Sequence, residues 1–139
     1  MPLFLLLLQG CAKGRRITHE PIKEQNGIIK IDLKDIRKGA IHFYTFNSPK
    51  GKRIDFFVAK DSNGNINSAF DACAICYRKR LGYRKEDEYI VCNACGNKYE
   101  IADLDKGLGS CLPIPLKHSI EGEYLTIKTP EFLRGGYLF

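Results

Sequence analysis

Several features that mark common classes of protein are missing from this chain. No Cys-x-x-Cys-His sequence occurs, which excludes covalent attachment of a c-type haem. No Ser/His/Asp grouping, glycine-rich phosphate-binding motif or acidic metal-binding loop stands out. Helix signals are weak, and we find no internal repeat, low-complexity segment or second domain. These absences leave the cysteines as the residues on which a chemical function would depend.

Length and charge set further limits. The chain has 139 residues, enough for one domain, and 44% of them are hydrophobic, so it can bury a core. It carries 22 Lys plus Arg against 16 Asp plus Glu, a formal net charge of +6. This excess is spread along the chain, whereas a nucleic-acid-binding protein usually gathers it on one face or stripe. We therefore expect solvated surface charge and no nucleic-acid partner.

Residues 1–11 resemble the signal segment of a bacterial lipoprotein. An uninterrupted apolar run over residues 3–8 is followed by Gln9, Gly10 and Cys11. The run is far too short to span a bilayer, which takes about 20 residues, and it has the shape of a signal-peptide core that ends at a small residue. We expect Cys11 to become the lipid-bearing first residue and to anchor the protein at the membrane, on the periplasmic or extracytoplasmic side. The alternative is an apolar tail with an ordinary thiol.

Residues 12–26 show no hydrophobic period and contain Pro and Gly, so they predict a flexible spacer. The folded domain is expected over residues 27–139, and its periodicity is mostly two. Ile29, Ile31 and Leu33 alternate with charged residues, the pattern of a strand buried on one face. Segments rich in β-branched and aromatic residues predict further strands over residues 41–46, 54–59, 66–71 and 124–128.

Local signals complete this picture of the fold. Asn63 and Gly64 predict a type I′ hairpin turn, because both central positions of that turn need a positive φ. Residues 129–133 predict one short helical turn, with Pro130 near its start. The predicted fold is mainly β: a small single β-rich domain with a cysteine-rich, zinc-ribbon-like metal-knuckle insert.

Four cysteines form two Cys-x-x-Cys pairs, Cys73 with Cys76 and Cys92 with Cys95, with fifteen residues between the pairs. Two residues between thiolates allow both sulfurs to point at one ion from a tight turn, and Gly96 after the second pair suits such a turn. The intervening segment is long enough for a hairpin that brings the pairs together. Four thiolates satisfy a tetrahedral Zn²⁺, with bonds of about 2.3 Å, and equally an iron–sulfur cluster. The spacing predicts a metal site without identifying the metal.

Other uses of these cysteines stay open. One is a zinc ribbon that only staples a small core, and another is disulfides, since an export signal leads to an oxidising compartment. If Cys11 is lipidated, five cysteines remain, and paired disulfides cannot use an odd number. A redox-active dithiol normally opens a helix in a βαβ unit, and neither pair lies in such a pattern. We therefore rank a metal site above disulfides.

Further residues are candidates for the same site. Cys111 lies in a glycine-containing loop and is a fifth candidate ligand, a substitute ligand or a buried bystander. His118 follows it by seven residues and is a weaker candidate, whereas His19 and His42 are expected to be structural or surface residues.

Aromatic and basic residues surround the first cysteine pair. We expect Tyr77, Tyr83 and Tyr99 to shield the site with their rings, although ordinary core packing explains them too. Three basic residues, 78–80, directly follow Cys76. Positive charge beside an anionic cluster favours its reduced form, and a solvated loop is the alternative explanation.

The segment from Ala69 to Tyr77 resembles the FtrD-like family of membrane iron–sulfur proteins. The likeness continues through Gly82-Tyr83-Arg84 and residues 91–96, and then through the loop around Cys111 and residues 113–116. Either cysteine pair alone is unspecific, but the combination of motifs is specific. The resemblance matches the family's cysteines to Cys73, Cys76, Cys92, Cys95 and Cys111.

This resemblance implies a membrane-associated protein that holds an iron–sulfur cluster and is linked to electron transfer in iron uptake. Its expected partners are membrane redox or iron-transport proteins, and we expect no catalysis beyond electron exchange. The main alternative is a non-catalytic binding or assembly module with structural zinc. A thiol–disulfide enzyme ranks below it, and a zinc-ribbon nucleic-acid-binding protein ranks last.

Overall fold

The computed structural model describes residues 17–106 and 110–139, and a five-stranded sheet lies at its centre. The strands follow the order β1 (Glu20–Ile22), β3 (Ile41–Asn47), β4 (Arg53–Lys60), β5 (Ile66–Cys73) and β9 (Pro113–Pro115). The neighbours β3, β4 and β5 are antiparallel, whereas β1 pairs with β3 in parallel. Antiparallel neighbours need only short connections, in agreement with the turn predicted between β4 and β5.

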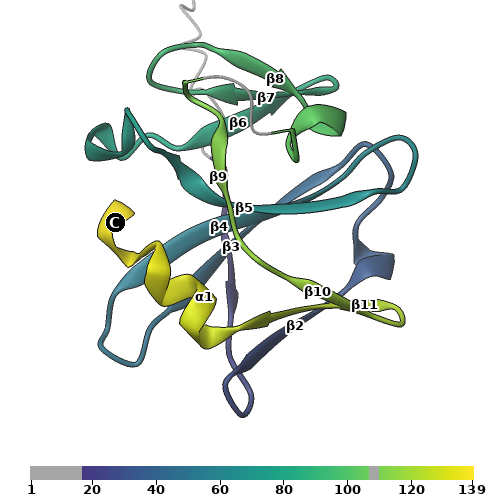
Figure 1. The fold of residues 1–139 in the computed structure, drawn as a ribbon, viewed down its shortest axis with the longest axis vertical. Helices are drawn as coiled ribbons and strands as arrows, with labels where there is room; N and C mark the ends of the chain where they lie inside the picture. The colour runs from purple at the N-terminus through teal and green to yellow at the C-terminus, as the bar shows by residue number, and fades with distance from the viewer. Residues whose placement is uncertain (1–16, 107–109) are drawn as a thin grey trace, which may run out of the picture.

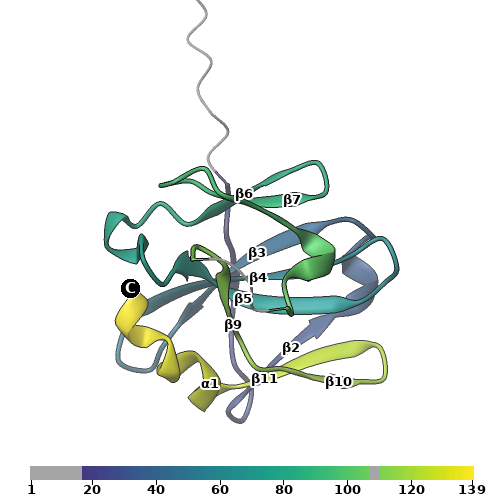
Figure 2. The ribbon, with the colours of Figure 1, turned by 45° about the horizontal axis from the view of Figure 1, so that its top comes forward.

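Two three-stranded sheets lie at opposite ends of the molecule (Figures 1 and 2). In one, β11 (Tyr124–Lys128) lies between β10 (Ser119–Glu121) and β2 (Ile28–Asp32), and the helix α1 (Thr129–Arg134) follows it. In the other, β7 (Tyr89–Cys92) lies between β6 (Tyr83–Glu86) and β8 (Lys98–Glu100). Short 3-10 turns span Leu33–Asp35, Tyr77–Lys79, Ile101–Asp103 and Gly136–Leu138. The β6–β8 sheet is the cysteine-rich insert that the sequence predicted.

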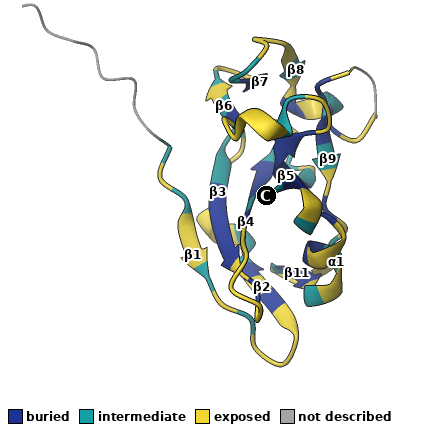
Figure 3. Ribbon diagram, turned by 90° about the vertical axis from the view of Figure 1, so that its left-hand side faces the viewer, coloured by how far each residue is buried: buried dark blue, intermediate teal, exposed yellow. Residues whose placement is uncertain are grey.

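Strands β3, β4 and β5 of the central sheet are largely buried, whereas β1 at its edge is mostly exposed (Figure 3). Each face of the sheet has its own hydrophobic core. Alternate residues of a strand point to opposite faces. Phe56 and Val58 of β4 therefore belong to the core shared with β2, β11 and α1, and Phe57 and Ala59 to the core shared with the β6–β8 sheet. This explains why residues 56–59 are apolar without interruption. The second core also contains Cys73, Cys92 and Cys111.

Aromatic packing attaches α1 to the central sheet. Phe132 is fully buried, and its ring centroid lies 4.6 Å from that of Phe46 and 5.0 Å from that of Phe56. An isolated helix of this length is unstable in water, so α1 depends on this contact.

Much of this architecture agrees with the sequence-based predictions. The mainly β fold is confirmed, and the predicted strands correspond to β2, β3, β4, β5 and β11. The predicted helical turn near the C-terminus is α1, with Pro130 in its first turn. In the part of the chain that the structure describes, no helix is long and apolar enough to cross a membrane.

The segment predicted as a spacer contains a strand. Within residues 12–26, β1 pairs with β3, with Glu20 opposite Tyr44 and Ile22 opposite Phe46. A strand of three residues is too short to show a hydrophobic period, so only its main-chain pairing reveals it.

The turn between β4 and β5 is not of type I′. Of the residues 61–65, only Gly64 has a positive φ, at 90°. The Asp61 carboxylate instead accepts hydrogen bonds from the main-chain amides of Asn63 at 2.9 Å and Asn65 at 2.8 Å. The turn is therefore stabilised by an aspartate side chain.

Substitution of Phe132 tests the packing of α1. We expect Phe132→Ala to lower the free energy of unfolding by about 3–5 kcal/mol, because it leaves a cavity between two aromatic rings. The neighbouring Leu133 is 53% exposed, so Leu133→Ala should change stability by less than about 0.5 kcal/mol. Urea denaturation of both variants at equal metal content measures the difference. Equal losses in the free energy of unfolding of the two variants would contradict the described packing of α1.

Candidate metal centre

Strands bring four of the cysteines to one end of the central sheet. β5 ends at Cys73, and the turn that follows carries Cys76. β7, the second strand of the β6–β7 hairpin, ends at Cys92. Because Pro113 of β9 pairs with Cys73, the β5–β9 ladder brings Cys111 beside the first pair. The site is therefore built by strand pairing and not by the two Cys-x-x-Cys turns alone.

The Sγ atoms of Cys73, Cys76, Cys92 and Cys111 all lie within 4.8 Å of one another. Those of Cys76 and Cys111 are 3.9 Å apart. Three of the four side chains are buried, and Cys76 is half-buried. The four thiols thus converge on one small volume that is largely shielded from solvent.

Main-chain amides point at the sulfurs from the turns. The amides of Ile75 and Cys76 each donate to Cys73 Sγ at 3.4 Å. Burial raises the pKa of Cys73, but these two amides, together with the neighbouring thiols, outweigh it and place the pKa below the ordinary value. In the second turn the Gly96 amide donates to the Cys92 carbonyl at 2.8 Å, and Gly96 has a φ of 75°, which glycine adopts readily. The first turn therefore favours the thiolate form of Cys73, the form that binds metals. In the second turn burial outweighs the amides of Cys95 and Ala94 and raises the pKa of Cys92 to about 11.

Cys95 is placed differently from the other member of its pair. Its side chain is exposed, and its sulfur is not among the four that lie within 4.8 Å of one another. Hydrogen bonds from the Asn97 amide and the Cys111 thiol lower the pKa of Cys95 to about 7. Cys95 therefore lies at the rim of the cysteine group and faces solvent.

Two tyrosine hydroxyls hold the main chain at Cys111. The Tyr83 hydroxyl donates to the Cys111 carbonyl at 2.7 Å, and the Cys111 amide donates to the Tyr99 hydroxyl at 2.9 Å. Burial raises the pKa of Tyr83, so this hydroxyl keeps its proton. Tyr77 packs edge-on against Tyr137, with ring centroids 6.1 Å apart. Tyr83 and Tyr99 thus position Cys111 by hydrogen bonds, a role that the expectation of aromatic shielding did not include.

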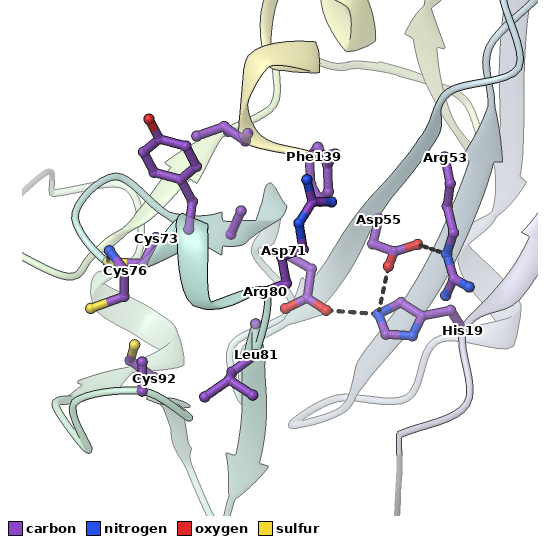
Figure 4. A pocket seen from close by; sticks show the side chains of 15 residues that line it. His19, Arg53, Asp55, Asp71, Cys73, Cys76, Arg80, Leu81, Cys92 and Phe139 are labelled. Carbon is purple, nitrogen blue, oxygen red and sulfur yellow. Dashed lines mark hydrogen bonds and ion pairs between the residues drawn. The ribbon is translucent and has the colours of Figure 1, made fainter.

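A pocket of about 260 Å³ lies beside the cysteine group. Figure 4 shows Cys73, Cys76 and Cys92 on one side of it and His19, Asp55 and Asp71 on the other. The pocket therefore connects the thiols with a set of charged side chains.

Asp71 joins three segments of the chain at this pocket. One carboxylate oxygen accepts a hydrogen bond from the Tyr83 amide at 2.7 Å, and the other lies 2.7 Å from His19 Nε2. Asp55 Oδ2 is 4.0 Å from the same nitrogen. Burial raises the pKa of Asp71, and the contacts with His19 and the Tyr83 amide offset it only in part. Burial alone would lower the pKa of His19, but its hydrogen bond to Asp71 and the charges of both aspartates raise it.

The contact between His19 and Asp71 was not predicted from the sequence. His19 lies in the segment predicted as a spacer, and nothing in the sequence relates it to a residue fifty-two positions away. A signal exists for Asp71, because it is the only charged residue of β5 and precedes Cys73 by two positions. A carboxylate inside a buried strand needs a partner.

The donor set suits a metal ion that prefers sulfur. Four thiolates bind Zn²⁺ or iron, with metal–sulfur bonds of about 2.3 Å for zinc. The hydrogen bond with Cys95, together with burial, raises the pKa of Cys111 far above its ordinary value. A cation bound beside this thiol would lower its pKa and favour the thiolate. The chemistry of these side chains fits the metal centre predicted from the sequence.

Comparison with known families agrees with this geometry. Residues 36–139 match the family described as membrane iron-sulfur containing protein, FtrD-like. The chain belongs to the FtrD-like family. The match covers the described cysteines and every strand after β2. No curated protein matches the chain.

The remaining candidate residues of this FtrD-like protein lie elsewhere. His118 Nδ1 is 2.6 Å from Ser68 Oγ, and the His42 ring lies beside Tyr44, so neither belongs to the cysteine group. Residues 78–80 are exposed. Cys11 lies outside the described residues, and its lipidation stays a prediction.

The contact between His19 and Asp71 predicts a pH-dependent stability. A pKa of His19 that is raised in the folded state stabilises the protein fully below about pH 6.5, the ordinary histidine value. This stabilisation is lost as the pH rises through the folded-state pKa. His19→Gln keeps a donor but cannot be charged, so we expect it to lose about 1.5 kcal/mol of stability at pH 6 and clearly less at pH 9.

Urea denaturation of wild type and His19→Gln at both pH values measures this effect. Thiolate ligands also take up protons at low pH, so the quantity to compare is the difference between the two proteins. His42→Gln is the matched control, because His42 lies outside the pocket. If the difference in the free energy of unfolding between wild type and His19→Gln were larger at pH 9 than at pH 6, the proposed charge on His19 would be contradicted.

Proposed function

We propose that this FtrD-like protein is a membrane-anchored electron-transfer module with an iron–sulfur centre, serving iron uptake or another membrane redox system. The observation that carries the proposal is the convergence of four cysteine sulfurs within 4.8 Å of one another. Family membership supports iron as the metal, since the family is described as iron–sulfur containing.

The ligand arrangement supports electron exchange over catalysis at the metal. Catalytic metal sites keep a coordination position open for substrate, whereas structural sites are closed by four protein ligands. Here the protein supplies four converging sulfurs and a fifth at the rim. A metal held in this way has no position for a substrate, but an iron ion retains its one-electron chemistry.

Hydrogen bonds and positive charges around the cysteine group would favour the reduced state of the proposed iron–sulfur centre. The amides of Ile75 and Cys76 donate to Cys73 Sγ, which spreads the negative charge of the thiolate. Hydrogen bonds to the ligand sulfurs and nearby positive charge both raise the potential of iron–sulfur centres. The exposed basic residues 78–80 directly follow the first pair and add such charge.

Anchoring and partners complete the proposal. Lipidation at Cys11 would hold the domain at the membrane surface through residues 12–16, on the periplasmic or extracytoplasmic side. Its partners would be membrane redox or iron-transport proteins, and we expect no nucleic-acid partner.

A structural zinc site is the second candidate function. The observation that favours it is the closed set of four thiols, because such sites also serve to stabilise small domains. In that case the protein would be a binding or assembly module that docks to a membrane partner.

Reversible reduction separates the two functions. The full chain, expressed with ample iron and purified without oxygen, should contain iron and absorb visible light. Its absorbance should fall on addition of dithionite and return on reoxidation. Protein loaded with zinc is the control, since zinc is redox-silent. Stoichiometric zinc without iron would remove the electron-transfer proposal.

Cell fractionation tests the membrane anchor independently. The wild-type protein should be found in the membrane fraction and should incorporate labelled fatty acid. Cys11→Ser should abolish the labelling and release the protein from the membrane, because a lipoprotein signal acylates this cysteine. Cys95→Ser is the matched control and should leave both unchanged. Labelling that persists in Cys11→Ser would refute the anchor.

A further inference from the structure

We propose that the centre holds a single metal ion, bonded to Cys73, Cys76, Cys92 and Cys111, and that Cys95 is not a ligand. This inference deepens the proposed function by defining its metal site, and it depends on that function only for the identity of the metal as iron. One iron ion bonded to four cysteine sulfurs is still an iron–sulfur centre, but it contains no inorganic sulfide.

The distances between the sulfurs support one ion. In a tetrahedron with metal–sulfur bonds of about 2.3 Å, any two sulfurs are about 3.8 Å apart. The Sγ atoms of Cys76 and Cys111 are 3.9 Å apart, and no pair among the four exceeds 4.8 Å. One pair therefore matches the separation that a single tetrahedral ion requires, and no pair is wider than it by more than about 1 Å.

A cluster with several iron atoms needs a wider arrangement. Its thiolates bind different iron atoms, and bridging sulfides lie between these atoms. Sulfurs bonded to different irons are therefore farther apart than two ligands of the same ion. At least some of the four cysteines would have to move outward to accept such a cluster.

The main chain at these cysteines is held in place. Cys73 pairs with Pro113 across the β5–β9 ladder, and Cys92 pairs with Tyr83 across the β6–β7 hairpin. The Tyr83 and Tyr99 hydroxyls bind the main chain of Cys111 on both sides. Moving the ligands apart would break strand pairing or leave buried polar groups without partners, which is unfavourable. The fold therefore favours the narrow, single-ion arrangement.

The same contacts select Cys111 over Cys95 as the fourth ligand. Cys111 is 4% exposed and belongs to the core beneath the site, whereas Cys95 is exposed. Cys111 also completes the group of sulfurs that are mutually close, and Cys95 does not. The proposed ligand set therefore differs from the two complete Cys-x-x-Cys pairs. It contains three of their cysteines, and Cys111, which precedes β9, takes the place of Cys95.

Metal and sulfide content measures the number of ions. The full chain, purified without oxygen, is examined by native mass spectrometry, metal analysis and assay of acid-labile sulfide. We expect one metal ion per chain and no labile sulfide. Two or more iron atoms with matching sulfide would overturn the inference and leave electron transfer intact. One zinc ion per chain would uphold the inference and remove electron transfer, so the two failures are distinguishable.

Cobalt substitution identifies the ligands without requiring activity. Co²⁺ bound to thiolates absorbs in the near ultraviolet and visible, with an intensity that rises with the number of thiolates. We expect Cys95→Ser to bind Co²⁺ with the wild-type spectrum and an affinity within about two-fold of it. Cys111→Ser should lose one thiolate from the spectrum and bind at least ten-fold more weakly.

Cys95→Ser decides the ligand question even if Cys111→Ser does not fold, because Cys95 is exposed. Loss of a thiolate from the cobalt spectrum of Cys95→Ser would overturn the inference. Tyr99→Phe offers a milder probe of Cys111, since it removes the acceptor of the Cys111 amide. It should weaken Co²⁺ binding while the spectrum keeps four thiolates; unchanged affinity would show that this hydrogen bond does not position the ligand.

Discussion

Mutual repulsion among four converging sulfurs, three of them in buried side chains, is the constraint on which the organisation of this domain depends. Thiolates within 4.8 Å of one another repel strongly wherever water is excluded, and burial opposes their ionisation. A cation relieves both effects, because it neutralises the sulfurs and replaces the solvent that they lose. Metal binding and the folding of the cysteine-rich end are therefore expected to be coupled, as in other small metal-stapled domains.

The central sheet provides the rigid support for this end of the molecule. Because both faces of the sheet are covered, β4 and β5 are fixed by two cores at once. β5 runs directly from these cores into Cys73, so the first candidate ligand is placed by a strand with six consecutive buried residues. The β6–β8 sheet then rests on the second core, which sets the position of Cys92. The centre is thus part of the hydrophobic core and not an appendage to it.

Asp71 links the metal centre to the rest of the chain. Through its two oxygens it contacts the start of β6 and the N-terminal segment at His19. This buried carboxylate ties together segments that the cysteines alone would leave independent.

Whether a feature of this domain could be predicted from the sequence depends on how far apart in the chain the residues that determine it lie. Alternating side chains predicted β2, β-branched and aromatic residues predicted β3 to β5 and β11, and the Cys-x-x-Cys spacing predicted two turns with candidate ligands, because all three patterns are local. A β1 strand of three residues and a turn held by the Asp61 side chain left no such pattern.

The sequence by itself determined the mainly β class, the cysteine-rich insert and the sulfur chemistry of the site, since each depends on residue type and short-range spacing. Tertiary structure alone decided that Cys111 joins the group while Cys95 faces solvent, and that His19 meets Asp71. Both outcomes depend on the pairing of strands that are far apart in the chain, and side-chain periodicity carries no information about which distant strands will pair.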